Sequence, residues 1–300
     1  MRAAVLGATG FVGRALVPAL AQQGEVVAVS RRASASELPG VRVVNADLTD
    51  GESTRGALEG VDVAYHLVHS LGARNFSELD RRVAENVVAE AERAGVAQIV
   101  YLGGLGDDAA DLSSHLRSRT DTGTVLASGT VPVTTLRAAV VVGRGSAAFE
   151  TIVALVDRLP VMVAPRWVST PTQPIALTDM VRYLTGVAGR TEALGESFDV
   201  GGPEVIAYGE MIRRIARLRG KRPLIVEVPV LSPRLSSYWL HLVTPVGASV
   251  ARPLVEGLRN PTIARDDRIR GLLPFPLTSF ADAARDALET REESGRNTGR

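Results

Sequence analysis

Short apolar runs alternate with segments whose apolar positions recur every three or four residues through the first half of the chain. The short runs predict strands at residues 3–6, 26–30, 42–45, 63–68, 99–102 and 133–142. The periodic segments predict helices at residues 14–23, 53–58, 78–94 and 114–128. Regular alternation of strand and helix is typical of a parallel sheet with helices on both faces. We therefore expect an α/β fold with a Rossmann-type, doubly wound parallel sheet.

This alternation gives way to a different pattern after Gly143. The later part predicts helices at 147–158, 178–187 and 209–218, a short strand at 198–200, and proline-containing stretches at 160–174 and 223–258. We expect residues 146–288 to form a small C-terminal α/β substrate lobe that is interleaved with a core of residues 1–145. Residues 289–300 are polar, and we expect them to be a frayed tail.

Three glycines stand between the first predicted strand and the first predicted helix. In a strand-turn-helix context, Gly7 permits the tight turn, Gly10 lets the backbone approach a pyrophosphate, and Gly13 lets the helix pack closely on the strand. The start of the helix then offers free N–H groups and a positive dipole to the phosphates. The pattern predicts a dinucleotide-binding loop in an NAD(P)-binding core. Its residues also include Thr9, Phe11 and Val12.

The end of the second predicted strand bears on which nicotinamide cofactor is bound. An acidic residue there selects NAD, whereas a basic one accommodates the extra phosphate of NADP. The chain has Ser30, Arg31 and Arg32 at this position, and two guanidinium groups suit a phosphate. This favours NADP (NADPH) over NAD, the alternative being a solvated basic loop. Asp47 and Leu48 follow the third predicted strand, where they contact the adenine, or Asp47 caps the next helix.

These motifs resemble the short-chain dehydrogenase/reductase superfamily, and more narrowly its atypical NAD(P)H-binding branch with the YbjT-like and NmrA-like proteins. The resemblance covers nearly the whole chain. Residues 61–70 match the fourth-strand region, Asn86 the fourth-helix asparagine, and residues 136–138 the sixth-strand motif. Residues 65–70, 102–106 and 116–119 together look most like the YbjT-like group. The resemblance implies further cofactor contacts from Leu67, Val68, His69, Asn86, Leu102, Gly103, Gly104, Arg119, Ala138 and Val140.

The chain departs from this family at the residues that move protons. Standard members carry a serine after the fifth strand and then Tyr-x-x-x-Lys, in which the lysine lowers the tyrosine pKa and the phenol exchanges a proton with the substrate. Here Gly103-Gly104 follows that strand, and His115-x-x-x-Arg119 is the nearest counterpart of the pair. This spacing puts both side chains on one helix face. A histidine with its ordinary pKa of about 6.5 suits proton donation near neutral pH, whereas the arginine holds the ribose and supplies positive field without relaying protons.

A simpler interpretation of His115 remains open. Asp111, Ser113 and Ser114 resemble helix-start residues, which places His115 in a first turn where it is merely exposed. The sequence alone does not decide between this exposed position and a catalytic role.

Two further histidines flank the end of the fourth predicted strand. The spacing of His66 and His69 puts them on different faces of a strand, so they do not both point at a cofactor. His69 and Ser70 lie just past the carboxyl end, where doubly wound folds bind ligands, and are the better catalytic candidates. The four histidines have no acidic cluster at ligand spacing, so no metal site is predicted.

Candidate walls of a substrate pocket are residues 103–106, 141–146 and 163–168, since ligands of this fold lie beyond the carboxyl edge of the sheet. Arg166 and Trp167 suit an anionic or planar substrate, although a tryptophan there also suits simple packing. The apolar stretch 238–243 suits a pocket wall, a homodimer contact or core. So few polar groups favour a small to medium-sized, largely apolar substrate.

Composition narrows the functional classes. A formal net charge of +1 provides no bulk field to recruit nucleic acid, and the absence of cysteine excludes disulfides and thiol chemistry and agrees with a reducing cytoplasm. No secretory signal precedes the first strand, and we expect a cytoplasmic protein. The apolar stretch 231–258 contains three prolines and charged residues, so no membrane span is predicted.

Three functions are compatible with these features. The first is an NADPH-dependent oxidoreductase that acts on an apolar carbonyl or enone, with hydride from the nicotinamide and a proton from a nonstandard donor or water. The second is a noncatalytic NADP(H)-binding protein that reports redox state or holds a partner, as NmrA-like regulators do. The third is a quinone-associated or assembly role resembling the accessory NAD(P)H-binding subunit of respiratory complex I.

Overall fold

The structure of the chain is a computed structural model that describes residues 1–32, 38–106, 112–228 and 256–297. Asp111 lies outside these residues, as does the apolar stretch 238–243, together with most of the stretch 231–258. None of the helices in the described ranges is both long enough and apolar enough to cross a membrane.

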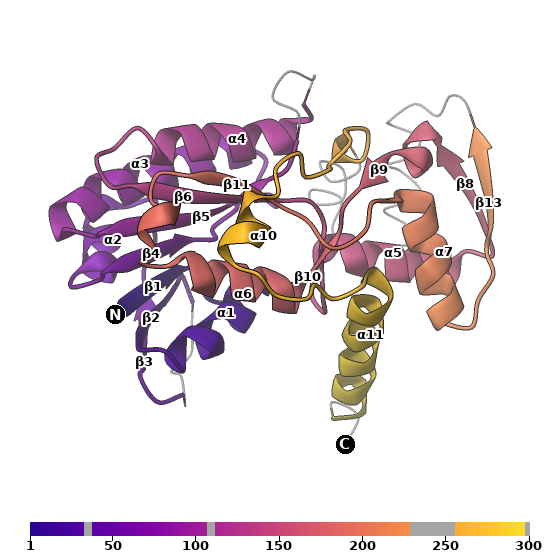
Figure 1. The fold of residues 1–300 in the computed structure, drawn as a ribbon, viewed down its shortest axis with the longest axis horizontal. Coiled ribbons are helices and arrows are strands. Elements are labelled where there is room, and N and C mark those ends of the chain that lie inside the picture. Colours follow the sequence, from indigo (N-terminus) through magenta and orange to yellow (C-terminus); the bar gives the residue numbers. More distant parts are fainter. Residues whose placement is uncertain (33–37, 107–111, 229–255, 298–300) are drawn as a thin grey trace.

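A seven-stranded parallel sheet forms the core, in the order β11-β6-β5-β4-β1-β2-β3 (Figure 1). Its strands are β1 (Arg2–Leu6), β2 (Glu25–Ser30), β3 (Val41–Asn45), β4 (Val63–His66), β5 (Gln98–Gly104), β6 (Val133–Ala138) and β11 (Ser197–Val200). The chain runs outward from β1 to β3, then crosses back to β4 on the other side of β1. Such a reversal opens a crevice outside the carboxyl ends of the strands. The predicted Rossmann-type α/β fold is confirmed.

Helices cover both faces of this sheet (Figure 1). Alternate residues of β1 point to opposite sides, so Ala3 and Val5 join one apolar cluster while Ala4 and Leu6 join another. One face is packed against α1 (Phe11–Ala21) and α6 (Leu177–Val187). The other face is covered by α2 (Gly51–Leu58), α3 (Phe76–Ala94) and α4 (Ser114–Leu126). The three-and-four residue spacing of apolar positions in these helices is what buries them on the sheet.

A smaller unit with its own apolar cluster lies beside the sheet (Figure 1). It contains α5 (Ala147–Arg158), α7 (Tyr208–Leu218), α11 (Phe280–Asn297) and the parallel pair β8 (Val161–Pro165) and β13 (Leu224–Val228). The remaining short elements are β7 (Val141–Val142), η1 (Arg166–Ser169), β9 (Pro171–Thr172), β10 (Ile175–Ala176), η2 (Thr191–Ala193), β12 (Ile206–Ala207) and α10 (Arg268–Leu272). The stretch 160–174, which the sequence indicates only as a proline-rich connection, therefore contains β8, η1 and β9.

The chain returns to the core sheet after residue 145. The strand at 198–200, which the sequence groups with the lobe, is part of β11 and pairs with β6 at the edge of the core. Buried Asp199 of β11 forms an ion pair with Arg137 of β6, with 2.6 Å between Oδ1 and Nη2. Helix α6 likewise packs on α1. At the C-terminus, α11 continues to Asn297, into the segment expected to be a frayed tail.

Candidate functional site

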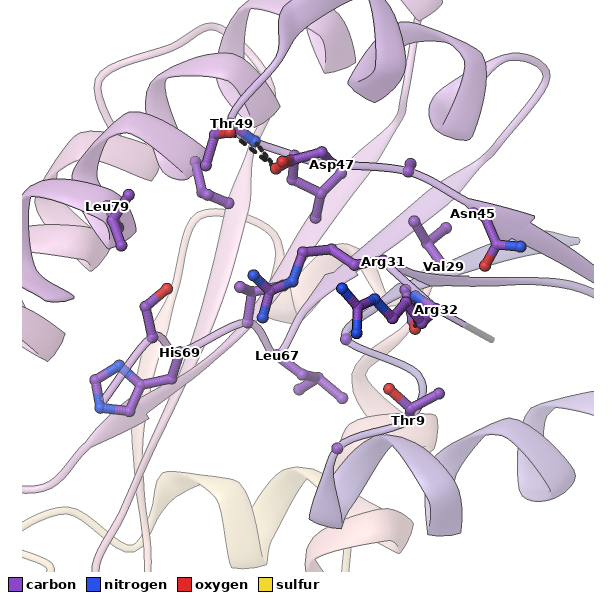
Figure 2. Close-up of a pocket in the computed structure, with 18 residues that line it drawn as sticks. Thr9, Val29, Arg31, Arg32, Asn45, Asp47, Thr49, Leu67, His69 and Leu79 are labelled. Carbon is purple, nitrogen blue, oxygen red and sulfur yellow. Dashed lines mark hydrogen bonds between the residues drawn. The ribbon is translucent and has the colours of Figure 1, made fainter. Parts of the chain in front are cut away.

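A cleft of about 980 Å³ lies outside the carboxyl ends of β1, β2, β3 and β4, at the crossover point of the sheet (Figure 2). Twelve residues that the sequence predicts for the site line it: Gly7, Thr9, Gly10, Ser30, Arg31, Arg32, Asp47, Leu48, Leu67, Val68, His69 and Ser70. These residues come from four separate segments of the chain. The cleft forms because parallel strands end at the same edge of the sheet.

The glycine loop after β1 has the geometry that its sequence predicts. Gly7 has φ +94°, in the left-handed region, and its N–H donates to the carbonyl of Val29 at 3.0 Å. A Cβ at Gly13 would lie 2.3 Å from the carbonyl oxygen of Gly7, so no larger residue lets α1 pack here. Helix α1 begins after Gly10, and no side chain caps it there. Its first turn therefore has backbone N–H groups available for a phosphate.

Two arginines follow β2 at one wall of the cleft. Arg31 and Arg32 are exposed, and Figure 2 shows their guanidinium groups reaching into the cleft. The backbone N–H of Arg32 donates to the hydroxyl oxygen of Ser30 at 3.2 Å, which holds the chain as it leaves the strand. The charge of Arg31 contributes to lowering the pKa of Asp47, but within the described ranges neither guanidinium forms a direct ion pair with a carboxylate. Both positive charges are therefore available to an anionic ligand.

The loop after β3 forms the opposite wall. Asp47 accepts hydrogen bonds from the backbone N–H and the hydroxyl of Thr49, at 3.0 and 2.8 Å, and these bonds lower the pKa of its carboxyl. The cap of α2 is Asp50, which accepts the N–H of Ser53 at 2.8 Å, so the capping role that the sequence left open for Asp47 belongs to Asp50. Asp47 is thereby held at the cleft in its ionised form.

Asn86 of α3 supports this loop without lining the cleft. Its side-chain amide donates to the backbone carbonyl of Leu48 at 2.9 Å. The asparagine thus holds the position of Leu48, one of the predicted adenine contacts.

The other predicted cofactor residues lie around neighbouring strand ends, apart from this cleft. Leu102, Gly103 and Gly104 end β5, and Ala138 ends β6 with Val140 just beyond it. A Cβ at Gly104 would lie 3.2 Å from the Leu116 side chain and 3.4 Å from Cβ of Arg119, because α4 rests on this strand end. Glycine in place of the usual serine therefore has a packing reason here.

A second cleft of about 450 Å³ lies on the other side of the glycine loop, and Thr9 lines both clefts. Phe11 of α1 lines the second cleft together with residues 142–145, which belong to a predicted substrate wall. Val12 is partly buried and packs against the apolar cluster of the core. Trp167 of the predicted wall 163–168 packs instead on Tyr208, with ring centroids 6.4 Å apart, as the packing alternative expects.

Three side chains form one hydrogen-bonded chain near the end of β4. Nδ1 of His69 lies 2.6 Å from Oδ2 of Asp80, and Nε2 of His69 lies 3.0 Å from Nδ1 of His115. The backbone N–H of Ser70 donates to the other carboxylate oxygen of Asp80 at 2.7 Å. The structure thus joins three of the predicted catalytic candidates through a residue that the sequence reasoning missed.

A signal for Asp80 is present in the sequence. Asp80 shares one face of α3 with Val83 and Val87, and its side chain is only 1% exposed. An acidic residue within an apolar helix stripe requires a buried partner. That partner is His69.

The surroundings of His115 differ from the expectation of an exposed histidine with an ordinary pKa. Burial, helped by His69 and Arg119, lowers the pKa of His115 to about 3. Burial also lowers the pKa of His69, although the hydrogen bond to Asp80 opposes this effect. Burial raises the pKa of Asp80, but hydrogen bonds from His69 and Ser70 outweigh it and hold that pKa below the usual range. At neutral pH these three hydrogen-bonded side chains are therefore a carboxylate and two neutral imidazoles.

Arg119 and His66 both contact the ring of Tyr101, close to these three side chains. Arg119 is buried, and its guanidinium lies 4.9 Å from the centre of the Tyr101 ring. His66 is fully buried, with its ring 5.7 Å from that of Tyr101, and does not line the cleft. The expectation that His66 and His69 do not face the same side agrees with this arrangement.

Comparison with known proteins agrees with this geometry. Residues 7–138 match a family of NAD(P)H-binding domains. The mitochondrial NADH dehydrogenase [ubiquinone] 1 alpha subcomplex subunit 9 of Arabidopsis thaliana is 24% identical over 76% of this chain, which spans 60% of the length of that relative. A nucleoside-diphosphate-sugar epimerase of Staphylococcus aureus superimposes with a TM-score of 0.76 at 17% identity, over 95% of this chain and 100% of the epimerase.

A second solved structure has a reductase activity in its name. The NADPH-dependent quinone oxidoreductase of Escherichia coli, determined with NADPH bound, superimposes with a TM-score of 0.76 at 21% identity, over 95% of this chain and 98% of that enzyme. At these identities the structural matches show a common fold. Residues 7–138 are therefore similar to NAD(P)H-binding domains, and the chain has the fold that these epimerase and oxidoreductase structures share.

Proposed function

We propose that this protein is an NADP(H)-dependent oxidoreductase that reduces a small to medium-sized, apolar carbonyl or enone compound. The observation that carries the cofactor assignment is the pair Arg31 and Arg32, which reach into the cleft beside the glycine loop. The NADPH complex of the quinone oxidoreductase with this fold supports the same cofactor.

The cleft residues fit NADP part by part. The start of α1 and the loop from Gly7 to Gly10 receive the pyrophosphate. Arg31 and Arg32 bind the phosphate on the adenosine ribose, where an acidic residue would instead select NAD. Leu48 contacts the adenine and is held there by Asn86. The cofactor, when bound, supplies a hydride to the substrate carbon.

The substrate side is built from less polar groups. Phe11, Val142 and Leu177 line the second cleft, and Thr9 connects that cleft with the cofactor cleft. Arg14, Arg144 and Asp286 also line the second cleft, so an apolar substrate would lie against its apolar residues. The residues Leu102, Gly103, Gly104, Ala138 and Val140 belong, in this proposal, to the nicotinamide side of the site.

Cofactor binding tests this assignment directly. We expect calorimetric titration to show tighter binding of NADPH than of NADH. Replacement of both arginines, Arg31→Ala with Arg32→Ala, should weaken NADPH binding by about tenfold to a hundredfold, because charge-assisted hydrogen bonds to the phosphate are lost. Binding of NADH should change little. Arg217→Ala, which removes an exposed guanidinium from α7, is the matched control. The assignment is contradicted if the wild type binds NADPH and NADH equally well, or if the double variant binds NADPH as tightly as the wild type does.

A second candidate function is a noncatalytic NADP(H)-binding protein that reports redox state or holds a partner. The observation in its favour is the pair Gly103 and Gly104, which replaces the catalytic serine of the family, together with the absence of a Tyr-x-x-x-Lys motif. The relationship to a subunit of an NADH dehydrogenase also agrees with a role in an assembly. Absorbance at 340 nm distinguishes the two functions: oxidation of bound NADPH by a panel of carbonyl, enone and quinone compounds supports the enzyme.

A further inference from the structure

Groups from three elements meet in the Asp80–His69–His115 chain. Asp80 belongs to α3, His69 follows β4, and His115 lies in the first turn of α4. Both ring nitrogens of His69 are engaged, one with Asp80 and the other with His115. In the described part of the chain, no hydrogen bond reaches Nε2 of His115, and this residue is only partly buried. His115 does not itself line either cleft, but it contacts His69, which lines the cofactor cleft.

The carboxylate determines where the protons of both rings lie. An ionised carboxylate only accepts hydrogen bonds, so Nδ1 of His69 carries a proton and donates it to Asp80. Nε2 of the neutral His69 ring is then an acceptor, and it receives the Nδ1–H of His115. Nε2 of His115 is left with a free lone pair.

We propose that Asp80 positions a two-histidine proton relay, and that Nε2 of His115 is the atom that exchanges a proton with the oxygen of a secondary alcohol or ketone substrate. This inference rests on the proposed function, which it extends by naming the proton path. In the oxidation direction, the O–H bond of the alcohol breaks and its proton goes to Nε2 of His115, while the C–H electron pair leaves as hydride to NADP⁺. The C=O double bond then forms, and the charge on His115 is shared through His69 with Asp80.

In the reduction direction the same steps run backwards. A proton enters the relay from solvent, and His115 gives it to the carbonyl oxygen as hydride arrives from NADPH at the carbon. This is the task that the tyrosine performs in standard members of the family, and neither a serine nor a tyrosine is needed for it.

The groups packed around the relay keep its resting form neutral. Burial disfavours a positive charge on either imidazole, Arg119 on α4 adds to this effect, and Asp80 opposes it. The guanidinium of Arg119 lies 4.9 Å from the centre of the Tyr101 ring of β5, and His66 of β4 is neutral because it is fully buried. Because the pKa values of both imidazoles are lowered, the neutral pair is a weak base. The same pair, once protonated, is a strong proton donor.

The tautomers of the two histidines test the relay without any substrate. We expect long-range ¹H–¹⁵N correlation spectra of the protein, labelled with ¹⁵N-histidine, to show His69 and His115 both as neutral rings protonated at Nδ1 at pH 7. Asp80→Asn should move both protons to Nε2. The amide oxygen of the asparagine must still accept the Ser70 N–H, so its NH₂ group turns toward His69. Nδ1 of His69 then accepts a hydrogen bond from this NH₂ group, and the proton of His69 moves to Nε2, from which it is donated to Nδ1 of His115.

Asp62→Asn is the matched control, because Asp62 also accepts a backbone N–H, from Arg2 at 2.7 Å, but lies at the opposite edge of the sheet. It should leave both tautomers unchanged. If Asp80→Asn does not fold, the wild-type protein still decides the matter through the scalar coupling across the N–H···N bond between His69 and His115. An Nε2–H tautomer of either ring in the wild type, or no coupling between them, overturns the relay.

NADPH titration separates failure of the relay from failure of the proposed function. We expect Asp80→Asn to bind NADPH within about twofold of the wild type, since Asp80 does not line the cofactor cleft. A wild type that does not bind NADPH contradicts the proposed function whatever the tautomers are. Normal NADPH binding with the wrong tautomers contradicts only the relay.

Discussion

Among single side chains, His66 is unusual because it is buried completely without a hydrogen-bond partner for either ring nitrogen in the described part of the chain. Burial, with a smaller contribution from Arg119, lowers its pKa from 6.5 to about 3. Burying a polar ring without hydrogen-bond partners lowers the free energy of unfolding. It lowers it further at acidic pH, where the unfolded chain binds a proton at His66 and the folded chain does not. The residue therefore makes stability depend on pH.

This dependence gives a prediction for His66→Phe. Between pH 6.5 and about 3 the unfolded chain binds a proton at His66 and the folded chain does not, so the free energy of unfolding falls as the pH falls. At pH 5 the loss from this one group is about 2 kcal/mol. His66→Phe should therefore raise the free energy of unfolding by about 2 kcal/mol more at pH 5 than at pH 7. Denaturant unfolding at both pH values measures it.

Tyr65→Phe is the control for this experiment. Tyr65 is the buried neighbour of His66 on β4, and its hydroxyl donates to the Leu184 carbonyl at 3.3 Å. Its replacement should change stability equally at pH 5 and pH 7. An equal effect of His66→Phe at both pH values would show that His66 titrates normally in the folded protein.

At the scale of elements, the close packing of α1 on β1 determines the backbone conformation of the glycine loop between them. The helix comes so close to the strand that a Cβ at Gly13 would meet the Gly7 carbonyl at 2.3 Å and the Ala8 backbone at 2.9 Å. These contacts are with backbone atoms, which cannot move aside as a flexible side chain can. The start of the helix and the loop are therefore a single rigid unit.

Gly13→Ala should push the start of α1 away from the loop. We expect NADPH affinity to fall by about tenfold or more, and the free energy of unfolding to fall by about 1–3 kcal/mol, as is usual for overpacking. Gly56→Ala in α2 is the matched control, since a Cβ there has no neighbour within 4 Å. It should leave NADPH binding unchanged and raise stability slightly, because alanine favours a helix over glycine. Titration calorimetry and denaturant unfolding give both quantities, and unchanged affinity in Gly13→Ala contradicts the rigid-unit description.

At the scale of the whole molecule, the parallel pairing of β4 and β5 brings together residues that are distant in sequence. His69 follows β4, Asp80 is on the next helix, and His115 is on the helix after β5. Because β4 and β5 are adjacent parallel strands, the segments that follow them meet at one edge. The proposed relay exists only in this assembled form.

The relay predicts how the rate of reduction depends on pH. Reduction consumes a proton from the relay, and the pKa of His115 is lowered to about 3, so only a small fraction of the relay is protonated at neutral pH. The rate at saturating NADPH should rise by up to about tenfold per unit as the pH falls from about 8 to 6. His115→Gln should lower kcat by about a hundredfold and abolish the pH dependence, with little change in the KM for NADPH. A pH-independent reduction by the wild type contradicts this prediction.

Much of the fold was predictable from local patterns. The helix predicted at 147–158 coincides with α5, and the first three predicted strands agree with β1, β2 and β3 to within one residue at each end. These elements have regular apolar periodicity and clear turn residues at their ends. Gly7 and Gly13 were predictable for the same reason, since a tight turn followed by close helix packing favours glycine at these positions of a Rossmann-type unit.

Other features were not accessible from local pattern. The strand at 198–200 is too short to indicate its partner, and only its pairing with β6 places it in the core rather than in the lobe. The sequence context of His115 indicates an exposed first turn, whereas the packing of α4 against the end of β5 partly buries it beside His69. Burial by distant segments is a property of the folded molecule.

The parallel α/β core, the glycine loop and the arginines that follow β2 could all be predicted from the sequence, because each depends on residues that are close together along the chain. The tertiary structure alone decided that Asp80, His69 and His115 form one hydrogen-bonded chain. It also decided that their pKa values differ from those of free side chains. Contacts between distant segments and the exclusion of water arise only when the strands and helices pack, so the protonation states of these three groups are a property of the assembled fold.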